Sequence, residues 1–239
     1  MEVYKLVATG QLKKFPHNYL EKESIKEIVR NVFLNELKLT REDVLKIKQE
    51  DMTSRYMGGF RKFFDMQNAL VMIYSFPEWD LKPWEFTKVH PKFWEDTNNQ
   101  REFVLWIAKK EGLDITCKED LRKITVQMIW KYRGSKALVA AGGTYGLLKT
   151  VCGDKYKEWE ITKVVSWTDE KVVEAVKWLL EEKLKITSKE SCKIRVTHFK
   201  KYNLDGMLQK ACNHSIIRAL NMAYPGRYTR KDARNIVLK

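Results

Sequence analysis

The sequence lacks the segments by which proteins cross or enter membranes. No apolar run reaches the 18 or so residues that a transmembrane helix needs, so we expect no membrane partner. The start, MEVYKLVATGQLKK, has no long apolar stretch after a basic beginning, and we expect no secretory signal. The 4 cysteines are scattered without a CxxC pair, which indicates reduced thiols and a cytoplasmic location.

The residues of common catalytic and metal sites are also scarce. Only 4 histidines occur, and the phosphate-loop pattern GxxxxGK[ST] is absent. A zinc site would have to be built from residues whose spacing does not match paired ligands, namely Cys192, His198, Cys212 and His214. No Ser, His and Asp grouping stands out, and His17-Asn18 and Asn213-His214 lack the ββα-metal frame of a His-Asn-His nuclease. We therefore expect a non-enzyme without metal or cofactor.

What the sequence does contain is an approximate internal repeat. The hexapeptide WEFTKV, which begins at Trp84, returns as WEITKV from Trp159. The pattern L-x-[LI]-T recurs near the same period, at 37–40, 113–116 and 184–187, and the stretch 69–74 recurs after two periods, at 219–224. Together they predict three diverged copies of about 75 residues, at 10–86, 87–161 and 162–239.

Each copy begins with apolar residues at helical spacing. This predicts amphipathic helices at 24–37, 98–111 and 168–184. Capping-box pairs mark their starts: Ser24 with Glu27, Thr97 with Gln100, and Ser166 with Asp169. The threonine that closes each L-x-[LI]-T pattern is expected to cap a second short helix, at 41–50, 118–123 and 188–193.

Further helical stretches follow, with glycine-containing turns expected at 57–59, 140–143 and 204–206. A helix, a turn and another helix this close together are compatible with a helix-turn-helix or a plain αα-hairpin. Strand signals are few. The expected fold is therefore all-α, with three tandem helical repeats that each contain helix-turn-helix-like hairpins.

The repeated hexapeptide falls where one copy meets the next. The segment FPEWDLKPWEF before it is rich in aromatic residues and proline. We expect Trp84 and Trp159 to be buried packing residues at these seams, because large aromatic side chains dominate burial.

The net charge is +14, and it is uneven. Residues 1–86, 87–161 and 162–239 contain 14 basic and 13 acidic, 14 and 10, and 17 and 8 residues respectively, and residues 185–239 alone contain 13 basic and 3 acidic ones. Such a surplus favours a polyanionic partner. The candidate nucleic-acid-binding residues are therefore the cations of the third copy: Lys189, Lys193, Arg195, Lys200, Lys201, Lys210, Arg218, Arg227, Arg230, Lys231 and Arg234.

Double-stranded DNA is the expected partner, with RNA as an alternative that charge alone does not separate from it. A protein-binding adaptor or phage-encoded inhibitor is the first alternative, because curved helical repeats present broad concave surfaces and the aromatic segment 76–86 could supply anchors. RNA binding is the second alternative. A solvated lysine face without any partner remains the simplest reading of each single cation.

The chain resembles an uncharacterised family of tandem-repeat proteins from Gram-positive bacteria and their phages. The resemblance rests on Met57–Phe60, Asn68–Leu70, Tyr74 and Lys82–Phe86 in the first copy, and on Asn203–Leu208, Ala219–Asn221 and Ala223–Gly226 in the third. The second copy departs, since AAGGTYGLLKTVCGDKYKEWEI has no Tyr-Pro pair. The family implies no established activity, although it is compatible with a regulator.

A second, shorter similarity is to the helical repeats that accompany homing endonucleases. It rests on Ser166-Trp167-Thr168-Asp169-Glu170. Those repeats resemble DNA-binding helix-turn-helix units, so the similarity implies contact with DNA.

Overall fold

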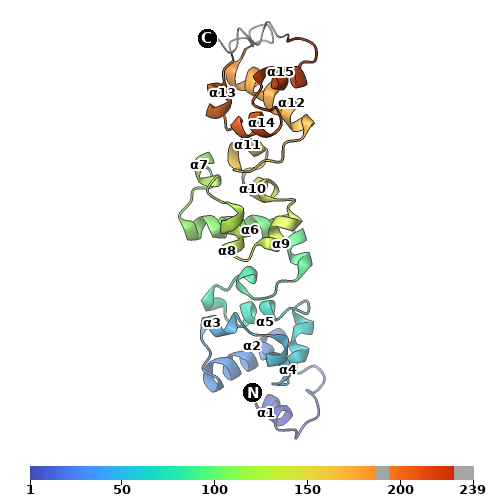
Figure 1. The fold of residues 1–239 in the computed structure, drawn as a ribbon. Helices are drawn as coiled ribbons and strands as arrows, with labels where there is room; N and C mark the ends of the chain where they lie inside the picture. Colours follow the sequence, from blue (N-terminus) through green and yellow to red (C-terminus); the bar gives the residue numbers. More distant parts are fainter. Residues whose placement is uncertain (187–193, 229–239) are drawn as a thin grey trace. The chain divides into compact units, whose positions relative to one another are not determined.

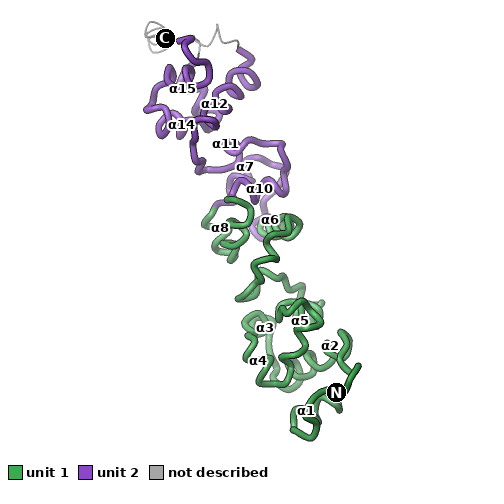
Figure 2. Tube along the Cα trace, turned by 90° about the vertical axis from the view of Figure 1, so that its right-hand side faces the viewer, with its two compact units in different colours: residues 1–107, 126–143 green, residues 108–125, 144–239 purple. Residues whose placement is uncertain are grey.

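Helices form every regular element that the computed structural model describes, which is residues 1–186 and 194–228 (Figure 1). The expected all-α fold is confirmed. The chain divides into two compact units: unit 1 is residues 1–107 with 126–143, and unit 2 is residues 108–125 with 144–239 (Figure 2).

Unit 1 is built around the packing of α2 on α5. Its helices are α1 (Glu2–Ala8), α2 (Lys22–Arg30), the π-helical η1 (Asn31–Glu36), α3 (Arg41–Val44), α4 (Gln49–Thr53), η2 (Gly58–Phe63), α5 (Asn68–Ser75), the short 3-10 helices η3 (Pro77–Trp79), η4 (Pro83–Glu85) and η5 (Pro91–Glu95), most of α6 (Thr97–Glu111), α8 (Val126–Lys131) and α9 (Ser135–Ala140). The apolar face of α2 is fully buried at Ile25, Ile28 and Val29, which gives the unit its largest continuous core.

Unit 2 is built around the packing of α12 on α15. Its helices are the end of α6, α7 (Lys118–Leu121), α10 (Thr144–Cys152), α11 (Glu158–Ile161), α12 (Asp169–Lys177), the π-helical η6 (Trp178–Leu184), α13 (Val196–Lys201), α14 (Asp205–Lys210) and α15 (Ile216–Ala223). Val172, Ala175 and Val176 of α12 are fully buried in its core.

The three long helices predicted from periodicity are present. They are α2 with η1, α6, and α12 with η6, and their bounds lie within two residues of those expected. The predicted caps are wrong. Ser24 lies inside α2, where its hydroxyl accepts a hydrogen bond from the Glu21 backbone N–H at 3.0 Å. Asp96 caps α6 by accepting from Asn98 N at 2.8 Å. Thr168 caps α12 by accepting from Lys171 N at 3.4 Å.

The short helices predicted at 41–50, 118–123 and 188–193 agree with the structure only in part. Thr40 caps α3 as predicted, accepting from Asp43 N at 3.3 Å, but α3 ends at Val44. Thr116 does not cap α7, because its hydroxyl donates to Asp114 Oδ1 at 2.7 Å instead. The helix predicted at 188–193 lies outside the described residues.

Trp84 and Trp159 are buried, as the sequence predicted, with 5% and 2% of their surfaces exposed. Each packs against the segment that follows it in sequence. In unit 1 the Trp84 ring lies 6.3 Å from Trp94 and 5.8 Å from Trp106. In unit 2 the Trp159 ring lies 5.9 Å from Trp167 and 5.5 Å from Trp178.

The angles between these rings also correspond. The planes of Trp84 and Trp94 meet at 33° and those of Trp159 and Trp167 at 29°, while Trp84–Trp106 and Trp159–Trp178 meet at 67° and 74°. A tyrosine completes each set edge-on: Tyr132 on Trp106 and Tyr202 on Trp178. The same aromatic quartet therefore occurs once in each unit.

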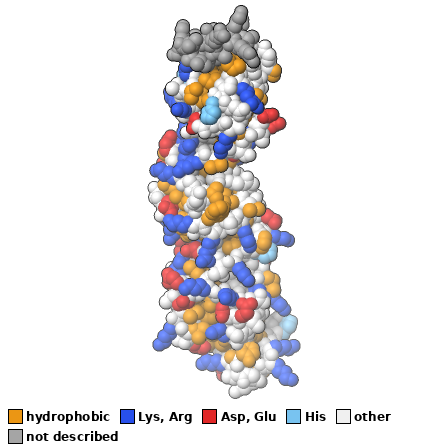
Figure 3. Space-filling view, viewed as in Figure 1, with side chains coloured by type: hydrophobic (Ala, Val, Ile, Leu, Met, Phe, Trp, Pro, Cys, Tyr) orange, Lys and Arg blue, Asp and Glu red, His pale blue; other side chains and the backbone are white. Residues whose placement is uncertain are grey.

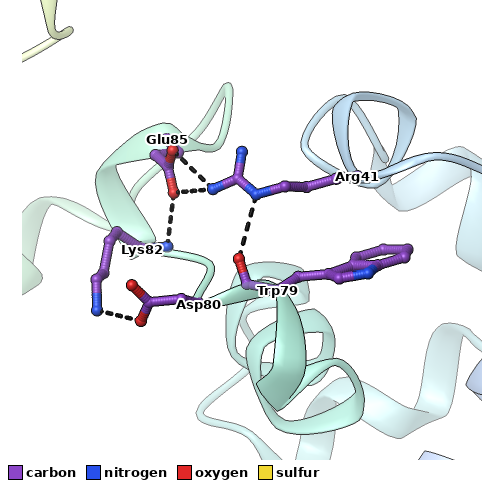
Figure 4. Close-up of polar contacts among 5 residues, drawn as sticks. All are labelled: Arg41, Trp79, Asp80, Lys82 and Glu85. Carbon is purple, nitrogen blue, oxygen red and sulfur yellow. Dashed lines mark hydrogen bonds and ion pairs between the residues drawn. The ribbon is translucent and has the colours of Figure 1, made fainter.

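The glutamate after each tryptophan fixes the same backbone turn. Glu85 accepts from Lys82 N at 2.9 Å, and Glu160 accepts from Lys157 N at 3.1 Å. Arg41 Nη2 also donates a hydrogen bond to each carboxylate oxygen of Glu85, at 2.8 and 2.9 Å (Figure 4). Arg41 begins α3 and donates further to the Trp79 carbonyl at 3.2 Å, so one guanidinium connects α3 to the turn that presents Trp84.

Unit 2 has a weaker form of this connection. Lys118, the first residue of α7, lies 3.9 Å from the Glu160 carboxylate, and Lys183 lies 3.8 Å from it. Arg122 donates to the carbonyls of Trp159 and Glu160 at 3.3 and 3.2 Å. These correspondences favour the three-copy interpretation, which stays a prediction.

Replacing Trp84 or Trp159 with alanine is expected to lower the free energy of unfolding by about 3–5 kcal/mol, because a large buried ring would leave a cavity. The phenylalanine variants should lose less, since neither indole N–H has a hydrogen-bond partner among the described residues. Thermal melts followed by circular dichroism measure this. Trp130→Ala is the control, because that side chain is 59% exposed. Unchanged melts for both buried positions would contradict the packing role.

Candidate nucleic-acid interface

Three helical hairpins share one construction. In each, two short helices are joined by a turn of three or four residues. The hairpins are α4–η2, α8–α9 and α13–α14, and in each the two helices pack on one another. The turns of the hairpins therefore lie at 54–57, 132–134 and 202–204. The glycine-containing turn predicted at 140–143 is present between α9 and α10, with positive φ at Gly142 and Gly143, whereas those predicted at 57–59 and 204–206 overlap the starts of η2 and α14.

The hydrogen bonds of the three turns are the same. A residue with φ near +60° follows each first helix: Tyr56, Arg133 and Asn203. The next residue donates its N–H five positions back, from Met57 to Met52, from Gly134 to Ile129 and from Leu204 to Phe199, at 2.8, 2.9 and 2.8 Å. This is the Schellman motif, which ends a helix in the left-handed conformation.

The residue after the left-handed position packs into the core differently in the middle hairpin. In the first and third hairpins this residue is Met57 or Leu204, and both side chains are fully buried. Gly134 takes this place in α8–α9, and a Cβ on it would lie 2.4 Å from the Phe103 ring and 2.6 Å from Ile129. The Phe103 ring therefore occupies the volume that a side chain fills in the other two hairpins.

The third hairpin presents several of the cations proposed from the sequence. Lys200 and Lys201 are exposed on α13, Lys210 is exposed at the end of α14, and Arg218 is exposed on α15. Residues 194–228 contain six basic residues and one acidic residue, Asp205.

Arg195 and Arg227 contact other groups of the protein. Arg195 is half-buried at the N-cap of α13, and its Nη1 donates to the Ile194 carbonyl at 2.9 Å. The Arg227 guanidinium lies 5.6 Å from the centre of the Tyr224 ring. Burial, and then a 2.7 Å hydrogen bond to Glu181, raise the pKa of Tyr224, so its hydroxyl stays protonated and donates. The remaining candidates lie outside the described residues: Lys189, Lys193, Arg230, Lys231 and Arg234.

The middle hairpin carries cations that the sequence analysis did not select. Residues 121–153 contain no Asp or Glu and six Lys or Arg residues, three of which lie in the hairpin: Lys131, Arg133 and Lys136. All three side chains are exposed. The signal was available in the sequence as an acid-free run, but counting charge over whole copies averaged it with the acidic residues on either side.

Charge is mixed over the rest of unit 1. On the face shown in Figure 3, Lys and Arg side chains are interspersed with carboxylates over the helices of this unit. The first hairpin shows the same mixture, with Glu50 and Asp51 beside Arg55, Arg61 and Lys62. The acid-poor hairpins α8–α9 and α13–α14 therefore differ from it in surface chemistry while sharing its construction.

A cleft of about 450 Å³ in unit 1 adjoins α9. Four cationic side chains line it, with one carboxylate: Lys48, Arg61, Lys88, Lys136 and Glu50. Lys136 donates to the Val89 carbonyl at 3.5 Å at its edge. The lining is therefore mainly cationic, and it includes Lys136 of the middle hairpin.

The residues considered for a zinc site are used otherwise. His198 Nδ1 accepts a hydrogen bond from Arg195 N at 2.9 Å, and burial raises the pKa of the Cys212 thiol. Cys192 lies outside the described residues. Across residues 1–186 and 194–228, no group of three or more His, Cys, Asp or Glu residues is arranged to hold a metal ion. None of the helices in the same residues is long and apolar enough to cross a membrane.

Comparison with known families agrees with part of the expected resemblance. Residues 1–81 match the model of a family described as "Protein of unknown function (DUF4046)". This supports similarity to an uncharacterised family over the first part of the chain. A search of curated proteins and a search of solved structures each found no match.

Gly134→Ala is expected to destabilise the protein by about 1–3 kcal/mol, because the new methyl group overpacks against the Phe103 ring. Gly59→Ala is the matched control, since nothing lies within 4 Å of a Cβ there. Shortening the neighbour in the double variant Gly134→Ala, Phe103→Leu should recover part of the loss. Urea denaturation measures each variant, and equal stability of the two alanine variants would refute the close packing.

Proposed function

We propose that the protein is a non-catalytic nucleic-acid-binding protein of the bacterial or phage cytoplasm, with double-stranded DNA as its main partner. One observation carries the proposal: the α13–α14 hairpin presents Lys200, Lys201 and Lys210 on exposed surface. Two short helices joined by a tight turn are compatible with a helix-turn-helix, a motif whose second helix enters the major groove.

The charge of this region supports the same partner. The cations of residues 194–228 outnumber the single carboxylate, and phosphates of a duplex would neutralise them. Lysines bind phosphate as point charges, so they give affinity and position while sequence discrimination requires contacts to base edges. The proposal is therefore of binding that tolerates many sequences, in agreement with a regulatory or architectural role.

RNA and a protein partner are the competing assignments. An A-form duplex hides its bases in a deep, narrow groove, and its 2′-hydroxyls are a distinct recognition feature. A protein partner would be bound mainly by a few large side chains that become buried at the interface, and not by cations spread over a surface. The binding experiment below separates all three, since it compares DNA and RNA duplexes of one sequence.

The triple variant Lys200→Glu, Lys201→Glu, Lys210→Glu is expected to bind labelled duplex DNA more weakly and with a smaller salt dependence. Each phosphate contact contributes about 0.9 to the slope of log affinity against log salt, so losing three lowers the slope by about 2–3. Fluorescence anisotropy at several salt concentrations measures both quantities.

The control is Lys13→Glu, Lys14→Glu, Lys62→Glu, which changes net charge equally at exposed positions of unit 1. It should bind nearly as the unchanged protein does. Equal losses in the two variants would show that overall charge, and not the α13–α14 surface, determines affinity. Absence of binding at low salt would remove the nucleic-acid assignment, and tighter binding to the RNA duplex would replace DNA by RNA.

A further inference from the structure

The feature that the fold does not explain is Trp130, at the end of α8. Its side chain is 59% exposed, while the other seven tryptophans are buried or half-buried. Exposing an indole forgoes a large gain from burial. The corresponding positions of the other two hairpins hold Thr53 and Lys200. The carbonyl of each accepts a hydrogen bond from the N–H of the left-handed turn residue, as the Trp130 carbonyl does. The hairpin therefore forms without an aromatic residue there.

The charged residues next to Trp130 in the sequence are cationic. The Trp130 carbonyl accepts a hydrogen bond from Arg133 N at 2.9 Å, which fixes the arginine backbone next to the indole-bearing residue. Arg133 is exposed and forms no ion pair with any described residue. Lys131 is also exposed, with its ammonium 4.9 Å from the centre of the Tyr132 ring. Residues 126–143 of unit 1 contain no carboxylate.

The surface of α9 continues in the same way. Lys136 is exposed, and Val139 is 83% exposed one helical turn further on. A surface that combines an exposed indole, exposed cations and no carboxylate of its own complements a polyanion that also has flat apolar faces. Single-stranded nucleic acid is such a polyanion, because its bases are free to stack and its backbone is negative. Within a blunt duplex the bases are stacked on one another and paired.

We propose that Trp130, with Lys131 and Arg133, forms a site that stacks on an unpaired base of a nucleic acid. This rests on the proposed function and adds to it that the bound nucleic acid includes a single-stranded segment. The indole supplies the stacking surface, and Lys131 and Arg133 contact the phosphates beside the stacked nucleotide. The α13–α14 surface contacts duplex phosphates, so the two hairpins recognise different parts of the nucleic acid.

The test compares three labelled DNAs: a blunt duplex, the same duplex with a 3′ extension of about ten thymidines, and the extension alone. Trp130→Ala in the full-length protein is expected to weaken binding of the two DNAs that contain the extension by about 5- to 100-fold, which is the effect of losing one stacked base. Affinity for the blunt duplex should change less than about twofold, since phosphate contacts dominate there.

Trp130→Phe should retain most of the affinity, because a phenyl ring still stacks. Val164→Ala is the control for loss of an exposed apolar side chain elsewhere, at a position that is 77% exposed in unit 2. Iodide quenching of tryptophan fluorescence gives an independent readout: the extension alone should protect the quenchable fraction that Trp130→Ala removes.

The outcomes separate this inference from the proposed function. If the blunt duplex binds through the α13–α14 lysines but Trp130→Ala has no effect on any DNA, the unpaired-base site is wrong and the proposed function stands. An equal loss on all three DNAs would also overturn the site, because it would place Trp130 on the duplex. If none of the DNAs binds at low salt, both proposals fail.

Discussion

The burial of one tryptophan side chain in each unit constrains the positions of the elements around it. Trp84 and Trp159 each contact two further tryptophans at closely similar distances and angles, and a tyrosine closes each set. Those partners lie on the segment before the long helix, on the helix itself and at the hairpin turn. Aromatic pairs favour offset and edge-on geometry, so a set of four rings permits few arrangements of the backbone that carries them. The glutamate beside each tryptophan then holds the turn from which the ring projects.

This packing explains how such short helices persist. The helices of the α8–α9 and α13–α14 hairpins have six residues each, far below the length at which an isolated helix is stable in water. Tyr132 and Tyr202 bring the turn of each hairpin against the quartet. The Schellman bonds then satisfy the last carbonyls of the first helix, and the inner faces are buried. The outer faces are left free to differ, which is why one construction carries mixed charge in one hairpin and almost only cations in the others.

The sequence predicts the three long helices well because each of them has one apolar face at helical spacing. Burial of Trp84 and Trp159 follows from the same kind of pattern. The caps were misplaced because several polar residues lie within two or three positions of each helix start, and only tertiary structure selects among them. The turns within the hairpins were not predicted because their left-handed residues include Tyr56 and Arg133, which are not residue types that mark such a conformation. Gly134 has a φ of −82°, so its role is steric and depends on where Phe103 lies in three dimensions.

The candidate site was predicted in part for a related reason. Counting charge over whole copies identified the third hairpin, where the surplus extends over the copy, and missed the middle one, where the acid-free run is flanked by Glu119, Asp120 and Asp154. A run of like charges on a short hairpin is unfavourable for folding, because its members repel one another and lack i,i+4 partners of opposite sign. The rest of unit 1 shows that the same construction tolerates carboxylates, as at Glu50 and Asp51 of the first hairpin. Folding alone therefore gives no reason for their absence from residues 126–143, which include Trp130. The negatively charged partner that we propose would give one, since each carboxylate there would repel it.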